Sequence, residues 1–203
     1  MPIIDLTHRI TDGMAVYPGD PAVSLRPVLA FPHQPCRVSQ LSFGSHTGTH
    51  MDAPAHMLEE GQTLDQYPVE GFCGAARVFS GDADFSQLDL SGLDFVLLDF
   101  HWAQRWGSPD FFHGYPALTA ENARILASSG LKGVGMDTPS VDNEASGLAL
   151  HHILLGSGLV LIESMGNLKR LPQSPVNLFA LPLKWKGSDG APCRAVAQWE
   201  NAT

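Results

Sequence analysis

The chain is poor in cysteine, in positive charge and in long apolar runs. Its three cysteines, Cys36, Cys73 and Cys193, are scattered and lack zinc-finger spacing, which argues against a disulfide framework and predicts reduced thiols in the cytoplasm. Only 12 lysines and arginines oppose 21 aspartates and glutamates, a formal charge of −9, so we expect no nucleic-acid partner. No window approaches the roughly 20 apolar residues that span a bilayer, and the N-terminus does not resemble a secretory signal. We therefore expect no membrane partner either.

Strand signals dominate the rest of the sequence. No repeat or linker divides it, so residues 1–203 are predicted to form a single domain. One helix is expected at 120–129, with Thr119 as its cap and Gly130 after its end, and a second at 148–155. The strand, helix and strand between Phe95 and Asp137 form a crossover unit, which predicts an α/β fold with a mixed, partly parallel sheet. The expected strands are 2–5, 37–43, 76–80, 95–100, 133–137, 159–163, 179–182 and 194–198, the last two forming a hairpin.

The densest group of potential metal ligands lies in the eleven residues from His46 to His56, which also include His50 and Asp52. In a helix, Asp52 and His56 would turn away from the face that His46 and His50 share, and Pro54 would break the hydrogen bonding. In an extended chain, all four side chains have the same parity and point to one side until the chain bends near Pro54. Imidazole and carboxylate without thiolate suit zinc, manganese or iron. The segment therefore predicts a metal site, and the alternative is a polar strand edge whose histidines bond to the backbone.

Distant residues must complete such a site. The segment from His151 and His152 passes through a Gly-Ser-Gly turn into an apolar run that ends at Glu163. A buried strand of this kind can deliver a carboxylate to a pocket, although a solvated strand end is an equally good interpretation. Spacing alone does not choose between the two histidines.

Two further segments have open interpretations. Residues 135–142 place two carboxylates and two hydroxyls after a buried strand, which suits either a pocket scaffold or a local turn around Pro139. The aromatic run 111–116 suits either core packing or contact with a partner or an apolar substrate.

These segments together resemble the metal-dependent cyclase family that includes bacterial kynurenine formamidase and isatin hydrolase. The matching stretches are His46-Thr-Gly-Thr-His-Met-Asp-Ala-Pro-Ala-His56, Gly135-Met-Asp-Thr-Pro-Ser-Val-Asp142 and the segment from His151 to Glu163, followed by Asn167-Leu168. The similarity extends from Asp5-Leu-Thr-His8 to Leu181-Pro-Leu-Lys184. It implies the swivelling β/β/α architecture and a homodimer or homotetramer.

The resemblance also implies a role for each site residue. His46, His50 and Asp52 would bind a first divalent ion, and Asp52 and Glu163 would bridge to a second. The family's spacing makes His151, rather than His152, the remaining ligand of that second ion. His56 would be the catalytic acid and base. Zinc is the first choice for both ions, and manganese is the second.

The implied activity is metal-dependent hydrolysis of a carbon–nitrogen amide bond, by a metal-activated hydroxide, in a small molecule. The substrate would be an aryl formamide such as N-formylkynurenine or a cyclic amide such as isatin. Tyr17 stands where kynurenine formamidase usually carries a tryptophan that contacts the substrate, so Tyr17 is the expected substrate-binding residue. Phe100, His101 and Trp102 are bulkier than their usual counterparts and are candidates to reshape the pocket.

Two alternatives to hydrolysis stay open. One is a metal-dependent lyase or cyclase that acts on a carbonyl or hydroxylated substrate, since the same Lewis acid and base can remove water as well as add it. The other is a non-catalytic module in which the ions only hold the fold. A closed coordination shell would favour this second alternative.

Overall fold

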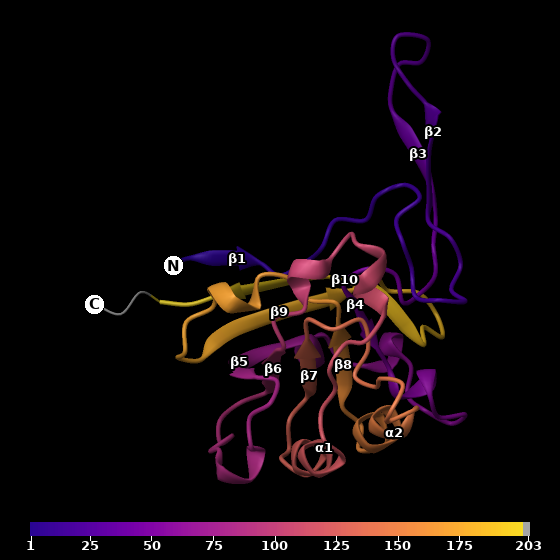
Figure 1. Cartoon of the computed structure of the whole chain (residues 1–203). Helices are drawn as coiled ribbons and strands as arrows, with labels where there is room; N and C mark the ends of the chain where they lie inside the picture. Colours follow the sequence, from indigo (N-terminus) through magenta and orange to yellow (C-terminus); the bar gives the residue numbers. More distant parts are fainter. Residues whose placement is uncertain (201–203) are drawn as a thin grey trace.

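Ten strands supply most of the regular structure in the computed structural model, which describes residues 1–200 (Figure 1). The strands are β1 (Ile3–Asp5), β2 (Ser24–Leu29), β3 (Val38–Ser42), β4 (His50–Asp52), β5 (Cys73–Ser80), β6 (Phe95–Asp99), β7 (Gly133–Met136), β8 (Val160–Glu163), β9 (Val176–Pro182) and β10 (Gly190–Gln198). The α-helices are α1 (Ala120–Ala127) and α2 (Ala149–Gly156). The 3-10 helices are η1 (Pro54–His56), η2 (Leu64–Gln66), η3 (Val69–Phe72), η4 (Phe85–Gln87), η5 (Ala103–Arg105), η6 (Pro109–Phe112) and η7 (Leu168–Arg170).

Eight of the strands form one mixed sheet with the order β1-β10-β4-β8-β7-β6-β5-β9. Strands β5 to β8 are parallel neighbours, whereas β4, β9, β10 and β1 join by antiparallel pairing. Because β9 also pairs with β10, the strands from β10 round to β9 close on themselves, with β1 outside. The predicted mixed sheet, the crossover from β6 through α1 to parallel β7 and the β9–β10 hairpin are all confirmed.

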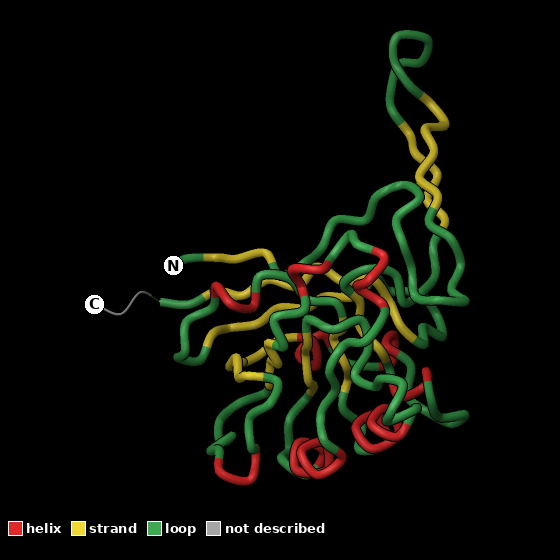
Figure 2. The backbone as a smooth tube through the Cα atoms, viewed as in Figure 1, coloured by secondary structure: helices red, strands yellow, loops and turns green. Residues whose placement is uncertain are grey.

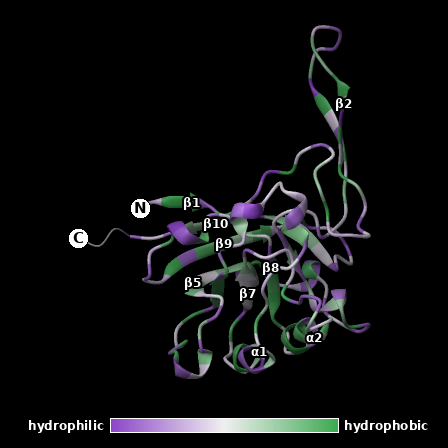
Figure 3. Ribbon diagram, in the orientation of Figure 1, coloured by the Kyte–Doolittle hydropathy of each residue, from purple (hydrophilic) through white to green (hydrophobic). Residues whose placement is uncertain are grey.

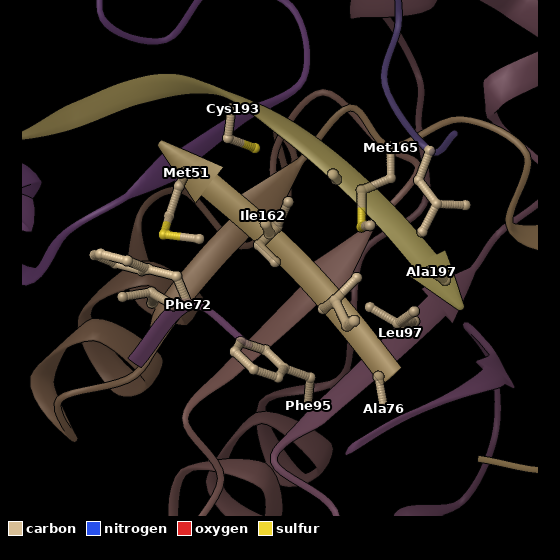
Figure 4. Packing of buried hydrophobic residues seen from close by; sticks show 14 of the residues in the cluster. Met51, Phe72, Ala76, Phe95, Leu97, Ile162, Met165, Cys193 and Ala197 are labelled. Atoms are coloured by element: carbon tan, nitrogen blue, oxygen red, sulfur yellow. The ribbon is translucent and has the colours of Figure 1, made fainter. Parts of the chain in front are cut away.

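Two apolar cores lie on the two faces of this sheet, as the period of two in β6 requires. Phe95 and Leu97 point into the core that the closed sheet surrounds, where they pack with Met51 of β4 and Ile162 of β8 (Figure 4). The alternate residues Val96 and Leu98 pack instead against α1 and α2. The result is the expected β/β/α arrangement, with both helices on one side of the sheet (Figure 1).

Local signals placed most element ends within a few residues. The Thr119 hydroxyl accepts a hydrogen bond from Asn122 N at 3.1 Å and caps α1 as predicted. In the aromatic run Phe111 and Tyr115 are buried in the interior, whereas Phe112 is only half-buried. β2 was not predicted, and β10 begins at Gly190 rather than at 194, because Ala191-Pro192 carries no strand signal of its own. Strand β10 forms there because it pairs with β4 and β9.

Candidate metal centre

The cluster of potential ligands forms where β4 lies beside β8. His50 and Asp52 are two residues apart in β4, so both point to one face, while Met51 between them enters the core. The antiparallel register sets Glu163, the last residue of β8, directly opposite His50. Glu163 is therefore a buried strand end and not a solvated one. The pairing of β4 with β8 thus brings together two segments that lie more than one hundred residues apart in sequence.

The extended conformation predicted for the chain ahead of Pro54 is found only in part, and the bend predicted near Pro54 is confirmed. Only His50–Asp52 is a strand. Gly48 turns the chain ahead of it with a φ of 69°, and Pro54 opens the 3-10 helix η1 that carries His56. The three histidines still converge, with ring centroids 5.1 Å apart for His46 and His50 and 4.0 Å apart for His46 and His56. Two turns, and not a common strand face, bring these rings together.

Asp52 stands at the centre of the cluster. Its Oδ1 lies 2.7 Å from His46 Nδ1 and 3.2 Å from His50 Nε2, and its Oδ2 lies 3.7 Å from His151 Nε2. Glu163 completes the group, with Oε2 3.6 Å from His50 Nε2 and Oε1 3.4 Å from His151 Nε2. Asp52 Oδ2 is buried and makes no hydrogen bond. Such an orphaned carboxylate oxygen is costly unless a cation satisfies it.

In each of three histidines, the ring nitrogen that points away from the cluster contacts an oxygen atom outside it. His46 Nε2 lies 3.1 Å from Asp189 Oδ2, His50 Nδ1 donates to Gly48 O at 2.9 Å, and His151 Nδ1 lies 2.8 Å from Asp142 Oδ2. This arrangement orients the other nitrogen of each ring toward the two carboxylates, as in metal sites where an outer acceptor fixes the ligand histidine. None of the hydrogen bonds within residues 1–200 involves the ring of His56, which stands beside the others.

The charges inside the cluster depend strongly on one another. Burial lowers the pKa of His46 and of His151, but the surrounding carboxylates outweigh it and raise these values to about 9 and about 12. Burial raises the pKa of Asp52, yet His50 and His46 hold it well below its ordinary value. Burial lowers the pKa of His56, and the opposing pull of Asp52 is too weak to restore it. Without an ion, the carboxylates of the cluster thus favour the protonated imidazoles of His46 and His151. The cluster therefore stabilises positive charge.

A cavity of about 210 Å³ opens beside the cluster. His46, His50, His56, His151 and Glu163 line it on one side. The other walls are mostly apolar or aromatic and include Val16, Tyr17, Met57, Trp106, Phe112 and Leu148. Tyr17 is anchored by a 3.3 Å contact between its hydroxyl and that of Tyr115, and its ring meets Phe112 edge to face. The cluster therefore faces a space that suits a small aromatic molecule.

The structure separates residues that the sequence left ambiguous. His151 is buried in the cluster, whereas the neighbouring His152 is exposed. The expectation that Phe100, His101 and Trp102 reshape the pocket was wrong, because none of the three lines it. Phe100 and Trp102 pack inward, and the His101 side chain is 68% exposed. They follow β6, in a segment where Asp137 accepts hydrogen bonds from the amides of Phe100, Trp102 and Ala103.

The interpretation of residues 135–142 as part of the pocket scaffold agrees with the structure, since Pro139 and Ser140 line the cavity. Two positioning residues were missed in the sequence. Asp142 belonged to this scaffold but carried no sign that it would hold His151. Asp189 lies in the β9–β10 loop, where no pattern distinguishes it from a turn residue.

Comparisons with known proteins agree with this geometry. A family model described as "Putative cyclase" matches residues 4–143. The chain belongs to this cyclase family. Among curated relatives, the kynurenine formamidase of Salinibacter ruber is 34% identical, with 97% of each chain covered. The solved structure of a potential metal-dependent hydrolase with cyclase activity is similar, with a TM-score of 0.80 at 29% identity over 97% of this chain and 96% of that one.

A second structural neighbour supports the fold alone. Isatin hydrolase A from Labrenzia aggregata, bound to benzyl benzoate, has a TM-score of 0.84 at 24% identity, with 97% of this chain and 93% of that chain covered. The β/β/α fold is therefore shared over nearly the whole length of both chains.

Proposed function

We propose that this protein is a metal-dependent hydrolase that cleaves the carbon–nitrogen amide bond of a small aryl formamide or cyclic amide. The observation that carries the proposal is the buried cluster around Asp52, which opens on an aromatic-walled cavity. The names of the relatives, kynurenine formamidase and isatin hydrolase, support the same reaction class. A purely structural metal site would be closed on all sides, and the open cavity argues against that alternative. Hydrolase relatives favour amide cleavage over a lyase reaction.

The residues fit a divalent cation. Among residues 1–200, Asp52 Oδ2 has no hydrogen-bond partner. The potential ligand atoms lie within 4.8 Å of one another in each of two groups, the first formed by His46, Asp52 and His56 and the second by His50, Asp52 and Glu163. We assign His46, His50 and Asp52 to a first ion, and Asp52, Glu163 and His151 to a second. Mixed nitrogen and oxygen ligands suit zinc, and manganese is the alternative. When bound, such ions lower the pKa of water toward about 7 and polarise a carbonyl oxygen.

The chain's own side chains supply the other requirements. His56 borders the cavity, and no acceptor among residues 1–200 fixes its ring, so it can take a proton from the attacking water and return it to the leaving nitrogen. Tyr17, Trp106 and Phe112 form the aromatic wall that holds the substrate ring and excludes water. Asp142 and Asp189 keep His151 and His46 in place.

Two substitutions separate the proton-transfer role from metal binding. His56→Ala should keep its metal and lose about 10²- to 10⁴-fold in kcat, the usual contribution of a general acid and base. His50→Ala should lose metal and activity together. Metal content by elemental analysis and turnover of formanilide, N-formylkynurenine and isatin measure both effects. Full activity in a chelator-treated, metal-free preparation contradicts the proposal, and loss of metal from His56→Ala would make His56 a ligand.

The setting of the enzyme is part of the proposal. We place it in the cytoplasm as a single-domain homo-oligomer, a homodimer or homotetramer, that acts on a small molecule. The three cysteines are unpaired, which agrees with a reducing compartment. Within residues 1–200, no helix has the length and apolar character needed to cross a membrane.

A further inference from the structure

A second hollow, which we call the polar cleft, lies outside the carboxyl ends of the parallel strands. Ser80 and Asp99, the last residues of β5 and β6, pair in the register of these strands, and Asp137 directly follows β7. All three line the cleft, and Figure 2 shows the chain leaving β6 and β7 as loops. Within residues 1–200, the cleft shares no lining residue with the cavity at the metal centre. The carboxyl edge of parallel strands is a common place for a ligand.

The polar cleft has two adjoining parts that share Asp99, His101, Leu168 and Lys169. The first part, of about 190 Å³, is bordered by η5 and η7, which are mainly hydrophilic (Figure 3). The second part, of about 300 Å³, has apolar walls that include Val78, Phe79 and Leu171. The cleft therefore offers charged groups directly beside an apolar pocket.

One negative and one positive side chain lie where the two parts meet. Asp99 is buried, and its Oδ1 accepts a hydrogen bond from His101 N at 2.8 Å and lies 3.3 Å from His101 Nδ1. Within residues 1–200, no hydrogen bond or ion pair involves Asp99 Oδ2 or the ammonium group of Lys169. Asp137 is not available, because its carboxylate accepts hydrogen bonds from three backbone amides. Asp99 and Lys169 thus remain as two opposite charges that a ligand can satisfy.

A small zwitterion fits this arrangement better than an ion of one sign. Within residues 1–200, the groups of side chains close enough to hold a metal ion lie at the metal centre and not in the cleft. A simple anion would be repelled by Asp99, and a simple cation would be repelled by Lys169. An α-amino acid can present its ammonium group to Asp99 and its carboxylate to Lys169 in charge-assisted hydrogen bonds. Its side chain would then lie against the apolar walls of the second part, so that side chain should be apolar.

The His8 ring connects the polar cleft to the cavity at the metal centre. His8 lines the cleft and stacks on Trp106, which lines the cavity, with ring centroids 4.1 Å apart and an interplanar angle of 6°. Trp106 also directly follows η5, whose residues Ala103 and Gln104 line the cleft. Within residues 1–200, the buried His8 Nε2 has no hydrogen-bond partner, so no hydrogen bond fixes the ring through this atom. A ligand that packs on His8 and η5 would therefore restrict Trp106 on the other side of the stack.

We propose that the polar cleft binds an α-amino acid with an apolar side chain, and that the bound amino acid fixes the His8–Trp106 stack and so lowers KM for substrate in the cavity. Asp99 binds the ammonium group and Lys169 binds the carboxylate. An ordered Trp106 lowers KM, because less side-chain freedom is lost when the substrate ring meets it. The effect on KM rests on the proposed amide hydrolysis, whereas binding of the amino acid does not.

Calorimetric titration of the zinc-loaded protein with L-phenylalanine tests the binding site without any substrate. Asp99→Asn keeps the Oδ1 that accepts from His101 N but removes the charge, and it should weaken binding about tenfold in Kd. Lys169→Gln should weaken binding about threefold, because an ion pair with an exposed side chain is worth less. Asp89→Asn and Lys186→Gln remove the same charges at exposed positions outside the cleft, and they should leave Kd unchanged.

The two charges of the ligand are tested in the same way. Phenethylamine lacks the carboxylate and 3-phenylpropionate lacks the ammonium group, so each should bind more weakly than L-phenylalanine, by about tenfold for the acid that Asp99 repels. Saturable binding that is absent up to about 10 mM L-phenylalanine overturns the site. A Kd that both cleft variants leave unchanged overturns it equally.

Turnover of formanilide tests the link to the cavity. L-phenylalanine should lower KM about fivefold with kcat unchanged, which is at the lower end of usual coupling between two sites. Competitive inhibition that persists in Asp99→Asn and Lys169→Gln would place the amino acid on the metal centre and overturn the proposal. An unchanged KM while L-phenylalanine is bound overturns the link through Trp106. Failure to turn over any amide would overturn the proposed function instead, and the calorimetric result would still decide the site.

Discussion

Single side chains outside the cluster decide how its histidines are presented. Asp142 accepts hydrogen bonds from the backbone amides of Leu150 and His151 at the start of α2, and the same carboxylate holds His151 Nδ1. It therefore fixes both the position of the helix and the ring that the helix carries. Asp189, in a loop, holds the ring of His46 through Nε2. The Asp189 carboxylate also accepts a hydrogen bond from Ser45 Oγ at 3.2 Å.

Loss of the Asp142 charge should weaken metal binding without removing a ligand. Asp142→Asn is expected to lower affinity about 10- to 100-fold, the usual effect of removing an outer acceptor. Competition with a fluorescent chelator measures it. Asp89→Asn is the control, since Asp89 is an exposed turn residue that accepts from Ser91 N. Equal affinities for the two variants would show that His151 needs no outer partner.

Asp20 should make the enzyme discriminate between neutral and negatively charged substrates. Among the described residues, no Lys or Arg lines the cavity, and Asp20 is its only carboxylate outside the cluster. An acidic substrate meets repulsion there, so formanilide should be favoured over 2-formamidobenzoate. Asp20→Lys should raise the ratio of kcat/KM for the acid to that for the neutral amide about tenfold, because a unit charge nearby is worth on the order of 1 to 4 kcal/mol at 4 Å. Asp89→Lys controls for net charge, and an identical ratio in both variants would remove Asp20 from specificity.

The elements around β4 show what sequence patterns could and could not predict. The alternation of side chains along an extended chain correctly predicted that His50 and Asp52 share one face, because both lie in strand β4. It failed for His46, because Gly48 begins a turn that the pattern did not predict, and it did not extend to His56, which lies beyond the bend predicted near Pro54. The choice of His151 over His152 depended on which side of α2 faces the sheet. Spacing within a helix cannot reveal that before the sheet partner is known.

Gly190 is the clearest case of a tertiary requirement at an element end. It pairs with Asp52 in the register of β10 and β4, and a Cβ at this position would lie under 3.0 Å from Cε1 of His46. Gly190→Ala should displace the His46 ring, cost about 1 to 3 kcal/mol in unfolding free energy and lower metal occupancy. Gly156→Ala, where a Cβ meets nothing within 4 Å, should leave metal occupancy unchanged and should not lower the unfolding free energy, since alanine favours a helix more than glycine does. Calorimetry and elemental analysis report the two quantities, and full occupancy in Gly190→Ala would contradict the close fit.

The whole fold was more predictable than the site, because β6, α1, β7 and β8 carry local signals and their parallel order follows from the crossover rule. Strand β2 was missed because Pro27 interrupts its pattern and because, in the described part of the chain, β3 is its only strand partner. Closure of the sheet through β9 and β10 depends on pairings that join distant segments. These non-local pairings also assemble the ligand cluster, so fold and metal binding should be coupled.

Chelation should therefore destabilise the entire molecule and not only its activity. Metal that binds the folded state alone stabilises it by RT ln(1 + [M]/Kd), about 2.7 kcal/mol per site at 100 times Kd, and about 2 to 4 °C in Tm per kcal/mol is usual for a chain of this size. Removing one ion should thus lower Tm by roughly 5 to 11 °C, and zinc should restore it. The His50→Ala variant, which lacks a ligand of the first ion and a neighbour of both Asp52 and Glu163, should show a Tm that responds less to chelator and zinc than the wild-type Tm does. A wild-type Tm that is insensitive to chelator would mean that the paired imidazoles and carboxylates satisfy one another without an ion.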